Sequence, residues 1–144
     1  MGRPSSGRAT LRIQRITTDP DPYEPFRLAL GYRVGDLIFV SGQAAIDQNG
    51  QAVGAGDFDA QAEQTFTNLE RVLAAGGSSL ENVVKVTIFL TDMANFPKIV
   101  ELRGKWFTAP YPADTIVEVT ALALPELMIE IEAVAVADEA AERT

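Results

Sequence analysis

The sequence contains no cysteine and no histidine among its 144 residues. Without cysteine the chain forms no disulfide, no thiolate nucleophile and no zinc–thiolate site. Without histidine it lacks the side chain that most often serves as a general base near neutral pH, and also the commonest metal ligand. These absences exclude Ser-His-Asp catalysis. Any chemistry must use carboxylates, hydroxyls, Lys, Arg, backbone groups or water, and we expect no metal and no other cofactor.

Basic residues and long apolar runs are also scarce. The chain has 12 Lys and Arg against 20 Asp and Glu, a formal charge of −8, which argues against binding to a phosphate backbone. No run approaches the roughly 20 apolar residues of a membrane-spanning helix. The first ten residues lack the apolar segment of a secretory signal. We therefore expect a cytoplasmic protein that binds neither nucleic acid nor membranes.

Hydrophobic patterning predicts one domain with five strands and two helices. Strand-like segments share an apolar, β-branched or alternating composition and cover 11–16, 32–43 (with a turn at Gly35-Asp36), 82–92 and two runs within 111–136. Helical spacing of apolar residues runs from about 59 to Gly76-Gly77 and from 95 to 107. This order predicts an α+β domain in which two helices pack on one face of a mixed sheet. We place the domain at 11–137, between a flexible tail over 1–10 and a second tail over 138–144.

Carboxylates interrupt the apolar closing segment "YPADTIVEVTALALPELMIEIEAVAV", residues 111–136. A charged carboxylate in an apolar interior is costly unless it is paired or hydrogen-bonded. For Glu132 the pattern favours solvent exposure or an ion pair across a subunit interface. For Glu130 and Asp114 a functional role and a structural role both stay open. The run 129–136 is apolar on both alternating faces, which predicts that a second subunit covers the face without helices.

Three segments resemble the RidA/YjgF family, the reactive-intermediate imine deaminases also labelled endoribonuclease L-PSP. They are "VSGQ", "NVVKVTIFLTDMANF" and "PYPADTIVEVTALALPELMIEIEAVAV", and the resemblance extends over roughly 11–137. It implies the fold of bacillus-type chorismate mutase and a homotrimer with small-molecule clefts between subunits. Family deaminases hydrolyse enamine and imine products of amino-acid dehydratases to 2-keto acids and ammonia.

The resemblance also assigns site residues. In the family a glutamate of the final strand positions the attacking water, and an arginine after Pro-Ala binds the substrate carboxylate. By position the glutamate is Glu130, whereas the arginine is replaced by Asp114, a reversal of charge. The remaining ligand contacts that the resemblance implies are Ser41, Gly42, the backbone of Ile116, the aromatic residues Tyr23 and Phe26, and Asn95.

Several functions stay open on these residues. The leading hypothesis is a homotrimer whose cleft binds, and as an enzyme hydrolyses, a small imine, enamine or amine. Glu130 would direct water, and Asp114 would bind a cation or act as a second acid or base. Since Asp114 repels a carboxylate, we expect little of the usual 2-iminobutanoate/2-iminopropanoate deamination. The alternatives are a catalytically silent small-molecule-binding or interaction protein, and a deaminase that recruits Arg27 or Lys105; ribonuclease activity ranks last.

Overall fold

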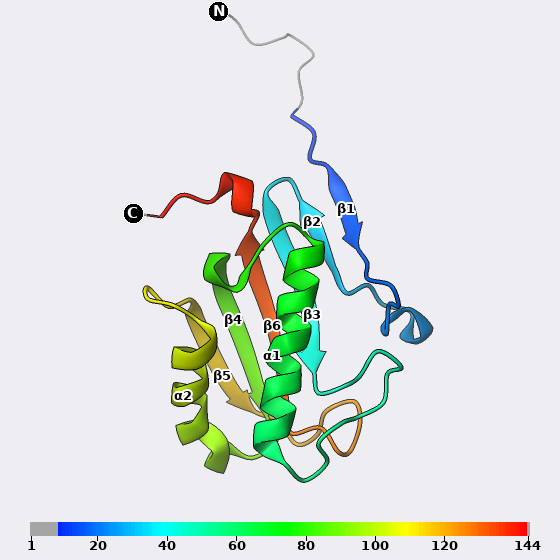
Figure 1. Ribbon diagram of the computed structural model, residues 1–144, viewed down its shortest axis with the longest axis vertical. Helices are drawn as coiled ribbons and strands as arrows, with labels where there is room; N and C mark the ends of the chain where they lie inside the picture. Colours follow the sequence, from blue (N-terminus) through cyan, green and yellow to red (C-terminus); the bar gives the residue numbers. More distant parts are fainter. Residues whose placement is uncertain (1–8, 144) are drawn as a thin grey trace, which may run out of the picture.

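The computed structural model describes residues 9–143 and consists of one six-stranded sheet with both helices on the same face (Figure 1). The sheet order is β1-β2-β3-β6-β4-β5. Only β4 and β5 are parallel neighbours. The strands are β1 Ile13–Ile16, β2 Gly31–Val34, β3 Leu37–Ala44, β4 Val83–Leu90, β5 Ala113–Glu118 and β6 Ile129–Val136, and the helices are α1 Phe58–Ala75 and α2 Phe96–Trp106. The predicted α+β architecture, with a mixed sheet and two helices on one face, is confirmed.

Two details differ from the expectation. The segment 32–43, counted as one strand with a turn inside it, forms the two strands β2 and β3, because Gly35 adopts φ +60° and reverses the chain between Val34 and Leu37. The segment 138–143 is anchored rather than a free tail. Asp138 accepts hydrogen bonds from the side chains of Ser79 and Asn82. The predicted N-terminal tail, 1–10, lies outside the described residues except for positions 9 and 10.

Helix α1 forms the main cover of the sheet. Asp57 caps its first turn by accepting a hydrogen bond from the backbone N–H of Ala60 at 3.1 Å. The helix ends before Gly77, whose φ of +85° lets the chain leave in a left-handed conformation. Its predicted apolar face is fully buried against the sheet, with Phe66 and Leu69 at 0% exposure. None of the helices within residues 9–143 is long and apolar enough to cross a membrane.

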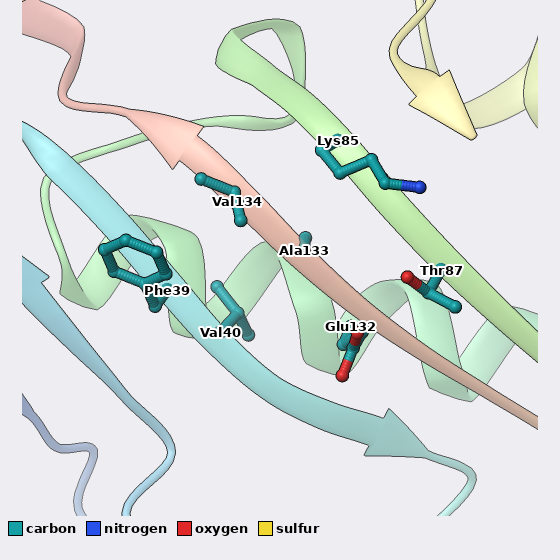
Figure 2. Close-up of a pocket in the computed structure, with 7 residues that line it drawn as sticks. All are labelled: Phe39, Val40, Lys85, Thr87, Glu132, Ala133 and Val134. Carbon is teal, nitrogen blue, oxygen red and sulfur yellow. The ribbon is translucent and has the colours of Figure 1, made fainter. Parts of the chain in front are cut away.

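The second face of the sheet carries no helix. The odd-numbered residues of β6, from Ile129 to Ala135, are buried under the helices, whereas the even-numbered residues turn to this open face. Tyr32, Leu37 and Phe39 remain 43–44% exposed there. Figure 2 shows part of this face with α1 behind the strands, around a hollow of about 210 Å³ whose lining includes Glu132 and Lys85. An apolar sheet face of this kind is typical of a subunit interface.

Candidate functional site

An irregularity in the pairing of β3 with β6 shapes the candidate site. Val40 pairs with Ala133, but Gln43 already pairs with Ile131, so β3 holds one residue more than its partner between these positions. Such an extra residue is a β-bulge, which bends the strand and redirects its neighbours. The bulge falls at Ser41 and Gly42, the strand end that the sequence had suggested as part of the site.

Gly42 leaves the space that the Glu130 carboxyl group occupies. A Cβ atom added at Gly42 would lie 2.4 Å from Glu130 Oε2 and 2.8 Å from its carboxyl carbon, closer than side chains approach. The hydroxyl of Tyr23 donates a hydrogen bond to the carbonyl oxygen of Gly42. The structure thus brings Tyr23, Gly42 and Glu130 together, three residues predicted from the sequence.

These three residues line a cavity of about 360 Å³ between the turn at 24–26 and the loop at 119–128. Its lining combines one carboxyl group and one phenol with glycines and apolar side chains: Tyr23, Phe26, Leu28, Gly42, Ala44, Ile46, Gly50, Ala123, Leu124, Leu127 and Glu130. A largely apolar cavity with a few convergent polar groups is the usual form of a small-molecule site. Phe26, also predicted, stands at its rim.

The surroundings of Glu130 favour its uncharged form. Burial raises the pKa of Glu130, and the negative charge of Glu132 on the same strand raises this pKa further. Burial likewise raises the pKa of Tyr23, with a smaller contribution from Glu130, so the phenol stays protonated and keeps its hydrogen bond. A carboxyl group with a raised pKa is suited to accept a proton and then return it.

Two buried amides of α1 hold the cavity walls in place. The side chain of Gln61 donates to the carbonyl of Glu126 at 2.7 Å and accepts from the N–H of Met128 at 2.8 Å, which fixes the loop before β6. Asn68 donates to the carbonyl oxygens of Ala44 and Ile46, each at 2.9 Å. Sequence reasoning missed both residues. The sequence did indicate both residues, since an amide side chain on the apolar face of a helix requires a buried hydrogen-bond partner.

Within one chain, Asp114 lies away from Glu130, on the other face of the sheet. Asp114 is the β5 neighbour of Val86, which is buried beneath the helices, so its side chain turns toward α2. There Arg103 Nε donates to Asp114 Oδ2 at 2.9 Å. Glu130 points to the opposite face of the sheet. Strand parity thus separates the two acids, and Arg103 supplies the counter-charge of Asp114.

Other predicted contacts also lie outside the cavity lining. Ser41 donates its hydroxyl to the carbonyl of Ala29 at 2.6 Å, and Ile116 packs against the core beneath the helices. Asn95 precedes α2 without a capping side-chain hydrogen bond. Of the two cations considered as substitutes, Lys105 pairs with Glu63 at 2.8 Å.

The second cation, Arg27, lines a separate hollow together with Arg15 and Tyr32. Over the described part of the chain no group of three or more Asp or Glu side chains is arranged to hold a metal ion. The residues of the cavity therefore offer proton transfer and apolar contact.

The fold agrees with that of known proteins. Residues 16–137 match the family model described as endoribonuclease L-PSP. The chain belongs to the RidA/YjgF family. This membership confirms the resemblance noted in the sequence, together with the chorismate mutase-like fold that it implies.

Individual members support the assignment at useful levels of identity. Protein DfrA of Myxococcus xanthus is 39% identical over 117 residues, covering 81% of this chain and 88% of that protein. The 2-iminobutanoate/2-iminopropanoate deaminase of Dermatophagoides farinae is 32% identical over 125 residues, covering 87% and 95%. The crystal structure of RidA from the Antarctic bacterium Psychrobacter sp. PAMC 21119 has a TM-score of 0.78 and 35% identity, covering 85% of this chain and 98% of that one.

Proposed function

We propose that this RidA-family chain binds a small imine or enamine in the cavity at Glu130 and hydrolyses it to a carbonyl compound and ammonia. The observation that carries the proposal is the Glu130 carboxyl group, held against the backbone of Gly42 in an otherwise apolar cavity, with a pKa raised by burial. A relative named for imine deamination supports the reaction class. Ribonuclease chemistry is not proposed, because a chain of charge −8 is ill suited to bind RNA.

The proposed reaction needs only water and one carboxylate. Ionised Glu130 accepts a proton from a water molecule as the water oxygen bonds to the carbon of the C=N group, and it passes this proton to the imine nitrogen, which gives a neutral carbinolamine. Glu130 then accepts the hydroxyl proton of the carbinolamine and gives it to the nitrogen, so that the C–N bond breaks, the C=O bond forms and ammonia leaves. Tyr23 acts as a positioning residue, since its hydroxyl hydrogen is engaged by Gly42.

We further propose that the active form is a homotrimer in which a neighbouring subunit covers the open sheet face and completes the cavity. The support is the exposed apolar surface of Leu37 and Phe39 next to the hollow at Glu132 and Lys85. Sedimentation equilibrium at micromolar concentration should give three times the 15.5 kDa chain mass. A stable monomer at that concentration would contradict the proposal.

The usual substrate fits the cavity poorly. Among residues 9–143, no Lys or Arg side chain lines it, and its one charged side chain is the acid Glu130. A carboxylate 4 Å from ionised Glu130 would be repelled by about 4 kcal/mol at an effective dielectric constant of 20. We therefore expect slow hydrolysis of 2-iminobutanoate. The same lack of a cation also supports the alternative of a silent small-molecule-binding protein.

Imine hydrolysis with purified protein decides between these functions. Imines are generated by a coupled enzyme, and release of the carbonyl product is followed above the spontaneous rate. We expect acceleration that is lost in Glu130→Gln and retained in Glu101→Gln, a matched change at an exposed acid of α2. If no imine is accelerated while amines bind the wild type, the silent binding protein is the correct function.

A further inference from the structure

The rim of the cavity exposes two large apolar side chains. Phe26 and Leu28 both line the cavity, yet they remain 56% and 43% exposed. The Phe26 ring lies so close to Gly50 that a Cβ atom there would be 3.3 Å from a ring carbon. The ring therefore rests against backbone at the entrance. Exposed apolar surface beside a polar group inside a cavity is typical of a ligand-binding site.

The opposite wall is apolar and fixed. It consists of Ala123, Leu124 and Leu127 from the loop before β6. Gln61 of α1 holds this loop through its hydrogen bonds to Glu126 and Met128. A ligand group that enters between Phe26 and this wall meets hydrocarbon on both sides, and its burial is favourable only if the group is itself apolar.

The charge of the cavity also restricts which ligands fit. Among residues 9–143, Glu130 is the one carboxyl group in the lining. The basic side chains nearest in sequence to the rim face elsewhere, since Arg27 lies in the neighbouring hollow with Arg15. Arg103 lies beside Asp114 and already forms an ion pair with it. On the surface that one chain contributes to the cavity, a complementary ligand thus carries a neutral or positive nitrogen for Glu130 and no anion.

The geometry points to a hydrophobic, carboxylate-free imine as the substrate class, with Phe26 as the residue that determines specificity; this inference rests on the proposed function of Glu130. The nitrogen and the imine carbon lie at Glu130, and a ring or branched hydrocarbon group lies between Phe26 and Leu124. A volume of about 360 Å³ falls within the range of pockets for drug-sized ligands, roughly 300–1,000 Å³. For an aromatic aldimine the reaction is ArCH=NH plus water giving ArCHO plus ammonia.

The test compares two imines that differ in these properties. Benzaldimine is produced from benzylamine by a flavin amine oxidase, and 2-iminobutanoate is produced from threonine by a dehydratase. We expect kcat/KM for benzaldimine to exceed that for 2-iminobutanoate by at least tenfold. Phe26→Ala should lower the benzaldimine value about tenfold and the 2-iminobutanoate value by clearly less, so that the ratio of the two values falls. Phe96→Ala, which removes a 38% exposed aromatic ring outside the cavity, is the matched control and should change neither value.

Binding gives a readout independent of turnover. Calorimetric titration should show benzylammonium binding at least tenfold more tightly than 2-aminobutanoate, with the difference lost in Phe26→Ala. If 2-iminobutanoate is the faster substrate and both rates still depend on Glu130, the inference about the substrate class is overturned and the proposed function stands. If neither imine is accelerated, the proposed function itself is wrong.

Discussion

Replacing Gly42 by alanine tests how the site holds its carboxyl group. The φ angle of Gly42 is not in the left-handed region, so alanine is compatible with the backbone. The added Cβ would nevertheless lie 2.4 Å from Glu130 Oε2. Because the clashing atoms are the far end of a flexible side chain, Glu130 can rotate away while the sheet keeps its register.

The magnitudes of the two consequences differ. Rotating the Glu130 side chain off its preferred rotamer costs about 0.5–1.5 kcal/mol, so the loss of stability should be small. A displacement of a catalytic group by about 1 Å can cost on the order of 100-fold in rate. We therefore expect Gly42→Ala to fold, to lose at most about 1.5 kcal/mol of unfolding free energy, and to lose most of its imine hydrolysis.

The assay combines urea unfolding with imine hydrolysis in three variants. Gly104→Ala is the matched control, because Gly104 lies within α2 and an added Cβ meets nothing within 4 Å. It should gain up to about 1 kcal/mol from helix propensity and keep its rate. In a Glu130→Gln background, Gly42→Ala should still lower stability, since glutamine has the same shape, but should cause no further loss of rate.

Two results would refute this reasoning. If Gly42→Ala keeps its hydrolysis rate within twofold, the contact of Glu130 with Gly42 does not set the catalytic geometry. If the variant loses more than about 3 kcal/mol, the upper end for an overpacked site, the carboxyl group is not free to rotate. In that case the bulge itself requires glycine.

Three further predictions concern Gln61, Glu130 and Asp114. Gln61→Leu should lower the unfolding free energy by about 1–3 kcal/mol for each of the two backbone groups that it leaves unpaired, measured by urea titration; an unchanged midpoint would contradict the role given to the amide. Burial raises the pKa of Glu130 above about 4.3, the ordinary value for glutamate. As the pH rises from this value through the folded-state pKa, ionisation of Glu130 lowers the free energy of unfolding. In thermal melts, the melting temperature of Glu130→Gln should therefore rise relative to that of the wild type between pH 4 and pH 8. A difference between the two proteins that does not change with pH would contradict the raised pKa of Glu130. Asp114→Asn should destabilise the protein by up to about 1 kcal/mol at pH 7, the scale of a partly exposed ion pair, because it weakens the pair with Arg103. A gain in stability would mean that Asp114 is repelled by another acid in the assembled protein.

Much of the fold was predictable because it depends on local patterns. The period of apolar residues located α1, and β-branched composition located β4, since each pattern reports which side of an element is buried. The glycine pair at 76–77 correctly ended the helix. The division of 32–43 into two strands was within reach as well, because the turn at Gly35 had been recognised and only its consequence for the strand count was missed.

The site was less predictable because it depends on register. The one-residue bulge at Ser41 and Gly42 decides which side chains contact Glu130, and no local sequence pattern predicts this bulge. The family resemblance named Tyr23, Gly42 and Glu130, whereas the walls at Leu124 and Ile46 belong to segments whose position depends on long-range hydrogen bonds. The face of the sheet to which Asp114 turns was not predicted for a related reason, since position along a motif does not give that face.

The acid site and the open sheet face are physically linked through β6. Glu130 and Glu132 project on the same side of this strand, and the charge of Glu132 contributes to the raised pKa of Glu130. Glu132 also lines the open-face hollow that contains Lys85 (Figure 2). A second subunit that brings a cation to Glu132 would offset the effect of Glu132 on Glu130, whereas one that only excludes water would strengthen the repulsion between the two acids. In the proposed trimer, assembly would therefore act on the basicity of Glu130 as well as on the shape of the cavity, and the charge opposite Glu132 would decide whether the pKa of Glu130 falls or rises.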